Sequence, residues 1–232
     1  MNKRFLYTTY KNPLSSVKDV TFCMEELEKE LLGTDMKHLQ AFNRTYLIIT
    51  RNVFQKLGTG YFEDDELMQK LDIRFAGYYF DALKEYTRTK KTTPAWEELF
   101  DLCRKDTSYE IVYLAMGVNA HVNNDLPLTL RDVVKDPSFK EDYDKINEVI
   151  GSSLHEIFQS LERTEKALEP VYAIGMNRVI RKWRKNAWNT YLSLVKKTTE
   201  RTTIERNAFN LAVDFSSIYG FPQMYKMLRV VI

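Results

Sequence analysis

The chain has 232 residues, of which 44% are hydrophobic, 13% are aromatic and 28% are charged, and its formal net charge is +2. This apolar, nearly neutral composition excludes an intrinsically disordered chain, and the length is sufficient for one large domain with a sizeable core. Its 8 glycines and 6 prolines amount to roughly 6% of the residues, against an average of about 12%. That shortage argues against collagen-like chains, long linkers and all-β folds with many turns.

Apolar residues recur along the chain at helical spacing. Leu67, Leu71, Phe75 and Tyr78, for example, follow one another in steps of three or four, which places their side chains on one face of an α-helix. No stretch of useful length alternates apolar and polar residues in the manner of a β-strand. The sequence therefore predicts an all-α fold.

About eight helices are expected, in one compact domain that covers residues 1–232. The predicted helices span approximately residues 15–33, 36–57, 64–89, 94–105, 108–123, 138–166, 171–198 and 202–218, and a short helical piece follows Pro127. Prolines mark several boundaries, because the pairs Thr93-Pro94 and Asp136-Pro137 each predict an N-cap followed by proline in the first turn. Glu169-Pro170 predicts the end of a helix, since the residue before proline disfavours the α conformation.

The two cysteines and the N-terminal residues bear on the compartment. Cys23 and Cys103 each lie in a helix-patterned segment, without a second cysteine or a histidine at metal-binding spacing, and are expected to be reduced packing residues. The start of the chain is basic but is not followed by the apolar segment of a secretory signal. No apolar run approaches the 18 or so residues of a membrane span. We therefore expect a soluble, cytoplasmic protein without a transmembrane segment.

Several polar residues interrupt the predicted apolar faces. Asn43 falls within the apolar stripe of the helix at 36–57, and Asn147 within that of the helix at 138–166. Arg74 and Asp81 share the edge of the stripe at 64–89, where they would form a buried ion pair. A buried polar group without a partner costs about 1–3 kcal/mol. These groups are therefore expected to meet in a polar network or in a lined pocket.

Polar residues cluster in residues 119–125, which contain three asparagines together with His121 and Asp125, at the end of an otherwise apolar predicted helix. These last two residues are four apart and would project from one helix face. They would then either share one metal ion, or Asp125 would orient His121 as a general base. A structural alternative is that Asp125 is the N-cap of a new helix whose first turn contains Pro127.

Residues 119–127, with the sequence N-A-H-V-N-N-D-L-P, resemble the N-A-H-[IV]-N-x-D-L-P signature of an uncharacterised, mostly bacterial family of all-helical proteins, a domain of unknown function. Similar segments are residues 41–47, 75–83, 94–96, 142–147 and 187–188, so that the resemblance extends from about residue 36 to residue 195. The resemblance implies a helical fold and places the polar residues within a family motif. It carries no known activity.

Basic residues concentrate in the C-terminal third, where residues 171–210 have a local charge of +7. Trp183 nevertheless shares the apolar stripe of Ile180 and Ala187, while Arg181 and Lys182 lie on the opposite face. This arrangement is typical of an amphipathic helix with a solvated basic face, and it argues against nucleic-acid binding.

Two functional hypotheses follow from the polar cluster. In the first, the protein is a hydrolase of a small-molecule or lipid-like substrate, with His121 as general base or as ligand of one divalent metal ion. Asp125 would orient His121 or share that ion. The candidate substrate-binding residues are Asn43, Arg74, Asp81, Asn123 and Asn147. In the second hypothesis, the protein is a non-enzymatic helical binding or interaction protein, and the polar cluster fixes the register of its helices.

Overall fold

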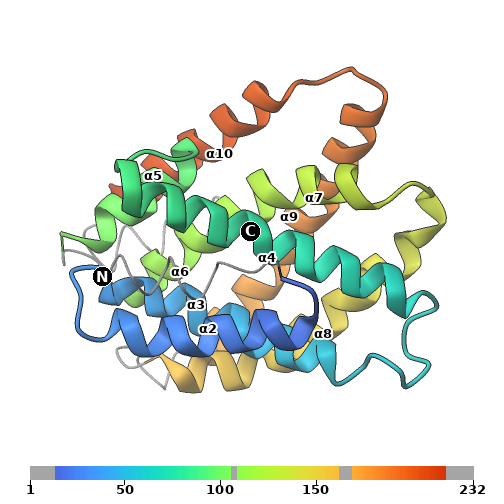
Figure 1. The fold of residues 1–232 in the computed structure, drawn as a ribbon, viewed down its shortest axis with the longest axis horizontal. Coiled ribbons are helices and arrows are strands. Elements are labelled where there is room, and N and C mark those ends of the chain that lie inside the picture. The colour runs from blue at the N-terminus through green and yellow to red at the C-terminus, as the bar shows by residue number, and fades with distance from the viewer. Residues whose placement is uncertain (1–13, 106–108, 162–168, 218–232) are drawn as a thin grey trace.

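The computed structural model describes residues 14–105, 109–161 and 169–217, which form helices joined by turns and contain no β-strand (Figure 1). The α-helices are α2 (Val17–Leu31), α3 (Gln40–Phe54), α4 (Asp65–Thr89), α5 (Pro94–Cys103), α6 (Glu110–Asn119), α7 (Leu126–Val133), α8 (Lys140–Ser160), α9 (Glu169–Val195) and α10 (Arg201–Ser216). Two 3₁₀ turns, η1 (Lys37–Leu39) and η3 (Pro137–Phe139), precede α3 and α8, and a π-helical turn, η2 (Ala120–Asp125), joins α6 to α7. The predicted all-α fold is confirmed.

The roles of the prolines agree with the predictions in two cases and differ in one. Pro94 and Pro137 each lie in the first turn of a helical segment, as predicted. Pro170 also lies in a first turn, that of α9, which begins at Glu169. The predicted helix end at Glu169-Pro170 is therefore wrong. Residues 1–13, 108, 162–166 and 218, which also carried predictions, lie outside the described residues.

Helix α6 is central to the fold. All residues from Ile111 to Asn119 are buried, which is the pattern of a helix enclosed on every side. The predicted one-sided stripe of this segment underestimates its burial. Helices α3, α5 and α10 pack against α6, and Figure 1 shows α2 and α4 on the outside of this group.

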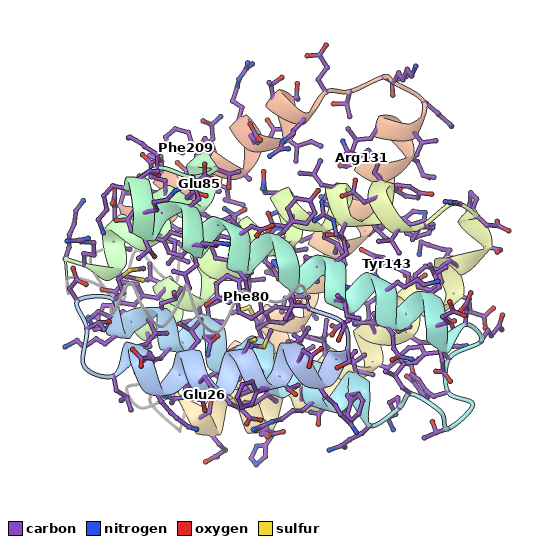
Figure 2. The ribbon with its side chains drawn as sticks, in the orientation of Figure 1. Glu26, Phe80, Glu85, Arg131, Tyr143 and Phe209 are labelled. Carbon is purple, nitrogen blue, oxygen red and sulfur yellow. The ribbon has the colours of Figure 1, made fainter. Side chains whose placement is uncertain are left out.

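The outer helices are amphipathic. On α4, Phe80 is buried whereas Glu85 is exposed, as can be followed in Figure 2. At the start of α2, the Ser16 hydroxyl accepts a hydrogen bond from the Asp19 amide at 3.2 Å, and the Asp19 carboxylate accepts one from the Ser16 amide at 2.9 Å. This capping box satisfies two amide groups that a helix start leaves open. Over the three described ranges, no helix combines the length and the apolar character required to cross a membrane.

Gly117 allows α6 to approach α3. A Cβ atom at this position would lie 2.4 Å from Cγ and 2.6 Å from Cβ of Phe42. These atoms are at the base of the Phe42 side chain and cannot move without the ring. The ring is held in turn by Tyr79, Trp96 and His121, with centroid distances of 5.1, 5.3 and 5.6 Å.

Gly117→Ala is therefore expected to destabilise the protein by about 1–3 kcal/mol, the usual cost of overpacking a core. Gly77→Ala is the matched control, because Gly77 lies within α4 and its Cβ would meet no atom within 4 Å. That control is expected to be neutral or to stabilise the protein by up to about 1 kcal/mol. Urea unfolding of both variants measures the difference, and equal stability of the two would contradict the close packing.

Candidate functional site

The candidate site is built on the π-helical turn between α6 and α7. The amide of Leu126 donates to the carbonyl of His121, a step of five residues instead of four. Proline lacks an amide donor and crowds the preceding turn of a regular helix, so a widened turn ahead of Pro127 accommodates it. Asp125 has helical dihedral angles (φ −79°, ψ −38°) and makes no capping bond with its side chain. Asp125 thus occupies the predicted N-cap position of α7, with Pro127 in the first turn, but its side chain does not cap the helix.

The Asp125 carboxylate is the polar centre of this turn. Its Oδ2 accepts a hydrogen bond from Trp96 Nε1 at 2.9 Å and lies 3.0 Å from His121 Nδ1. Its Oδ1 accepts a hydrogen bond from the side-chain amide of Asn124 at 2.8 Å. Because an ionised carboxylate only accepts, Nδ1 of His121 carries the hydrogen and Nε2 is left with a free lone pair.

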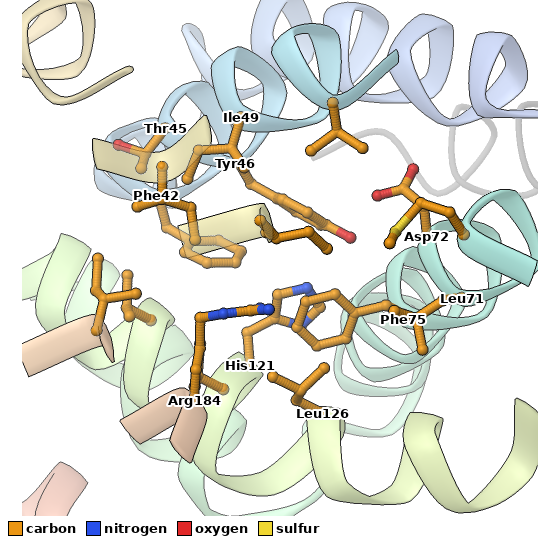
Figure 3. A pocket seen from close by; sticks show the side chains of 17 residues that line it. Phe42, Thr45, Tyr46, Ile49, Leu71, Asp72, Phe75, His121, Leu126 and Arg184 are labelled. Carbon is orange, nitrogen blue, oxygen red and sulfur yellow. The ribbon is translucent and has the colours of Figure 1, made fainter. Parts of the chain in front are cut away.

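His121 lines a cavity of about 80 Å³ (Figure 3). At roughly 10–15 Å³ for each water-sized group, this volume holds about five to eight such groups. The cavity lies among α3, α4, α6, η2, α7, α8 and α9, and most of its wall is apolar. The apolar lining residues are Phe42, Ile49, Val53, Met68, Leu71, Phe75, Val118, Val122, Leu126, Ile146, Ile150 and Ile180.

Three buried polar atoms in the lining residues have no hydrogen-bond partner. They are His121 Nε2, the Tyr46 hydroxyl and Asp72 Oδ2. Figure 3 shows the Tyr46 hydroxyl directed toward Asp72. Native proteins leave few buried polar atoms unsatisfied. Three of them around one cavity are therefore available to hydrogen-bond a polar molecule, water included.

Aromatic rings surround the imidazole of His121, a residue that is 3% exposed. The Phe75 ring stacks on it with a centroid distance of 3.5 Å and an interplanar angle of 8°, and the Tyr46 ring meets it edge-on at 4.5 Å. Burial lowers the pKa of His121, and the Asp125 carboxylate opposes this effect only in part. His121 is therefore neutral at pH 7. Burial has the opposite effect on a carboxyl group and raises the pKa of Asp72 to about 7.

Arg184 brings a positive charge to the same cavity. Its Nε donates to Asn147 Oδ1 at 2.9 Å, its Nη2 donates to the Tyr143 carbonyl at 2.7 Å, and its guanidinium lies 4.2 Å from the centre of the Tyr143 ring. Only 4% of the residue is exposed. Burial lowers the pKa of the guanidinium, yet an arginine remains charged at any physiological pH.

The structure brings together some of the residues predicted from the sequence. His121 and Asp125 form a buried pair, and Asn147 holds Arg184 at the cavity. Asn43 lies elsewhere, since its side-chain amide donates to the Met24 carbonyl at 3.0 Å and to the Glu28 carboxylate at 2.8 Å. Asn43 therefore ties α3 to α2.

Three other predicted residues do not line this cavity. Arg74 pairs with Asp132 at 2.7 Å, and Asp81 is exposed. The predicted buried ion pair between Arg74 and Asp81 is therefore wrong. Asn123, in the π-helical turn, donates to Oδ1 of Asn119, the last residue of α6, at 2.9 Å. The role of these three residues as substrate contacts stays a prediction.

Tyr46, Asp72 and Arg184 were not among the residues predicted to form the site. Arg184 follows the buried Ile180 by four residues, and the buried Trp188 follows it by four. Asp72 likewise follows the buried Met68 by four. Residues four apart share a helix face, so this spacing was the signal that could have identified both charged residues.

The His121 and Asp125 side chains are not arranged around a common metal position. Nδ1 of His121 and Oδ2 of Asp125, which would share an ion, are hydrogen-bonded to each other. Within residues 14–105, 109–161 and 169–217, no three His, Cys, Asp or Glu side chains lie close enough together to hold a metal ion. The metal-binding role of His121 and Asp125 stays a prediction.

Asp72→Asn tests the burial of Asp72. In the unfolded chain an aspartate has a pKa of about 3.9, whereas Asp72 in the folded protein has a pKa of about 7. The folded state binds the proton more tightly, so wild type loses stability as the pH rises from about 4 to 7. The variant avoids this loss. At pH 8 its melting temperature is expected to exceed that of wild type by at least about 2–4 °C, the shift produced by about 1 kcal/mol in a chain of this size.

The gain should shrink as the pH is lowered through 7 and vanish near pH 4. Glu85→Gln, an exposed carboxyl on the same helix, is the control and should give no such trend. A melting temperature of Asp72→Asn that follows wild type at every pH would show that the Asp72 carboxyl is solvated.

Comparison with known proteins adds a family to this geometry. The model of a family of unknown function, DUF5995, matches residues 17–217. No curated protein and no solved structure matches the chain. The family match covers α2 to α10, including the π-helical turn and every residue of the cavity. The chain therefore belongs to the DUF5995 family of unknown function.

Proposed function

We propose that the protein is a hydrolase of a small, largely apolar substrate, with His121 as general base. The observation that carries this proposal is the buried His121–Asp125 pair, whose imidazole keeps Nε2 without a partner at an apolar cavity. A neutral imidazole held in one tautomer by a carboxylate is the usual arrangement of a histidine that accepts a proton. The volume of about 80 Å³ favours a small molecule over a long lipid chain.

In the proposed reaction, Nε2 of His121 takes a proton from a water molecule while the oxygen of that water molecule bonds to the carbonyl carbon of an ester. Asp125 stabilises the imidazolium that forms. The Tyr46 hydroxyl, which is buried and without a partner, donates a hydrogen bond to the carbonyl oxygen as it becomes negative. The bond to the alcohol then breaks, and His121 returns the proton to the alcohol oxygen. The products are an acid and an alcohol.

The contacts of Asn43 support the second hypothesis for that residue alone. Asn43 holds α3 against α2. It does not line the cavity, and its side chain has no buried polar atom without a hydrogen-bond partner. The polar residues therefore divide into a structural group, which includes Asn43, and a group around His121 for which we propose chemistry.

The test is the hydrolysis of methyl butanoate and ethyl butanoate, followed by acid release at constant pH. We expect wild type to hydrolyse at least one of them, and His121→Ala to lower kcat/KM by at least about 100-fold, the usual contribution of a general base. His155→Ala is the matched control, because His155 is exposed on α8, and it should keep full activity. Folding of each variant is checked from its melting temperature.

Activity of wild type should survive dialysis against EDTA. Loss of activity on dialysis, with recovery on adding Zn²⁺, would overturn the general-base role in favour of the metal-ligand alternative. Absence of hydrolysis in folded wild type, or full activity of His121→Ala, would contradict the proposed function.

A further inference from the structure

No carboxylate forms an ion pair with Arg184 in the described part of the chain, and Asp144 acts on its charge only from beyond ion-pair distance. Its two hydrogen bonds go to neutral carbonyl oxygens, those of Asn147 and Tyr143, and its plane lies on an aromatic ring. Transferring a cation from water into an apolar interior is costly unless an anion compensates it. A fold that keeps Arg184 4% exposed at an apolar cavity is therefore suited to an anion supplied from outside.

Asp72 does not supply that anion. No ion pair joins it to Arg184 among the residues described, and the shift in the pKa of Asp72 has burial as its only cause. Figure 3 shows the two side chains at different ends of the cavity, with His121 between them. The lining thus offers a cationic end at Arg184, a neutral imidazole in the middle and a hydroxyl and carboxyl group at the other end.

From this arrangement we infer that the cavity binds a monocarboxylate with a short apolar body, and that Arg184 holds its carboxylate group. The planar guanidinium matches a carboxylate in shape and in charge. One cation balances a single negative charge, whereas a phosphate dianion would bring a second charge into an apolar site without a partner. A cavity volume of about 80 Å³ suits a small molecule of about five to eight non-hydrogen atoms.

The link from this binding site to catalysis rests on the proposed function. The body of the bound acid would extend past Nε2 of His121. A substrate would carry its free carboxylate at Arg184 and its ester bond near the imidazole. Anchoring of this kind fixes the reacting bond relative to the base and lowers the entropic cost of the reaction. Binding of the acid itself needs no catalysis and is testable separately.

The experiment compares pentanoate with pentanamide, two ligands of the same shape that differ in charge, by titration calorimetry at pH 7.5. We expect wild type to bind pentanoate about ten- to a hundredfold more tightly, the range that charge-assisted hydrogen bonds provide. In Arg184→Met, which keeps an apolar side chain of similar length, this preference should fall to about onefold. In Arg184→Lys, which keeps the charge but loses the planar geometry, it should be intermediate.

Arg181→Met is the matched control, because Arg181 lies one turn earlier on α9 with its side chain exposed. It removes the same charge from the basic face and should keep the full preference for pentanoate. Equal loss in Arg181→Met and Arg184→Met would show that pentanoate binds at the basic surface and would overturn the inference. Equal binding of pentanoate and pentanamide by wild type would also overturn it. If Arg184→Met does not fold, Arg184→Lys and the wild-type comparison still decide.

His121→Ala separates this inference from the proposed function. It should keep the preference for pentanoate while losing hydrolysis. If the protein prefers pentanoate but hydrolyses no ester, the carboxylate site is supported and the proposed hydrolase function is contradicted. If the protein hydrolyses neutral esters but shows no preference for pentanoate, the hydrolase function is supported and the carboxylate site is contradicted.

Discussion

The hydrogen bonds received by the Asp125 carboxylate are the constraint on which the rest of the site depends. A buried carboxylate is tolerated only when its oxygen atoms are satisfied, and here the donors come from α5 through Trp96 and from the π-helical turn through His121 and Asn124. The same bonds fix the imidazole tautomer and hold α5 against the π-helical turn. Stability and the chemical state of His121 are therefore properties of one network, which makes the two difficult to alter separately.

Around this network the fold arranges helices of two kinds. The outer ones are amphipathic, whereas α6 is buried along its whole length from Ile111. Gly117 lets the base of the Phe42 side chain pass close to the α6 backbone, and the Phe42 ring contacts the His121 ring. The position of the imidazole thus depends on backbone packing one turn away as well as on its own hydrogen bonds.

The sequence predicted the helices because apolar periodicity and proline position are local properties, visible residue by residue. It identified the His121–Asp125 pair for the same reason, since both lie on one helix. The partners from other helices could not be found in this way, because Trp96, Asp72 and Arg184 reach the site only through tertiary packing. Arg184 was counted only in the local positive charge of residues 171–210, although its spacing from Ile180 and Trp188 gives it a buried position. Asn43 shows the converse, since a polar residue on an apolar face can serve to join two helices.

The π-helical turn also changes the phase between the two helices that it connects. An α-helix advances about 100° per residue, so the extra residue taken up between His121 and Leu126 rotates α7 by about that angle relative to the continuation of α6. The continuous helical segment from α6 to α7 therefore presents different faces to the interior on the two sides of the turn. Val118 lines the cavity before the turn, and Leu128 and Leu130 are fully buried after it. A deletion of one residue within Ala120–Asp125 would remove this change of phase and turn every later side chain of α7 away from its present neighbours.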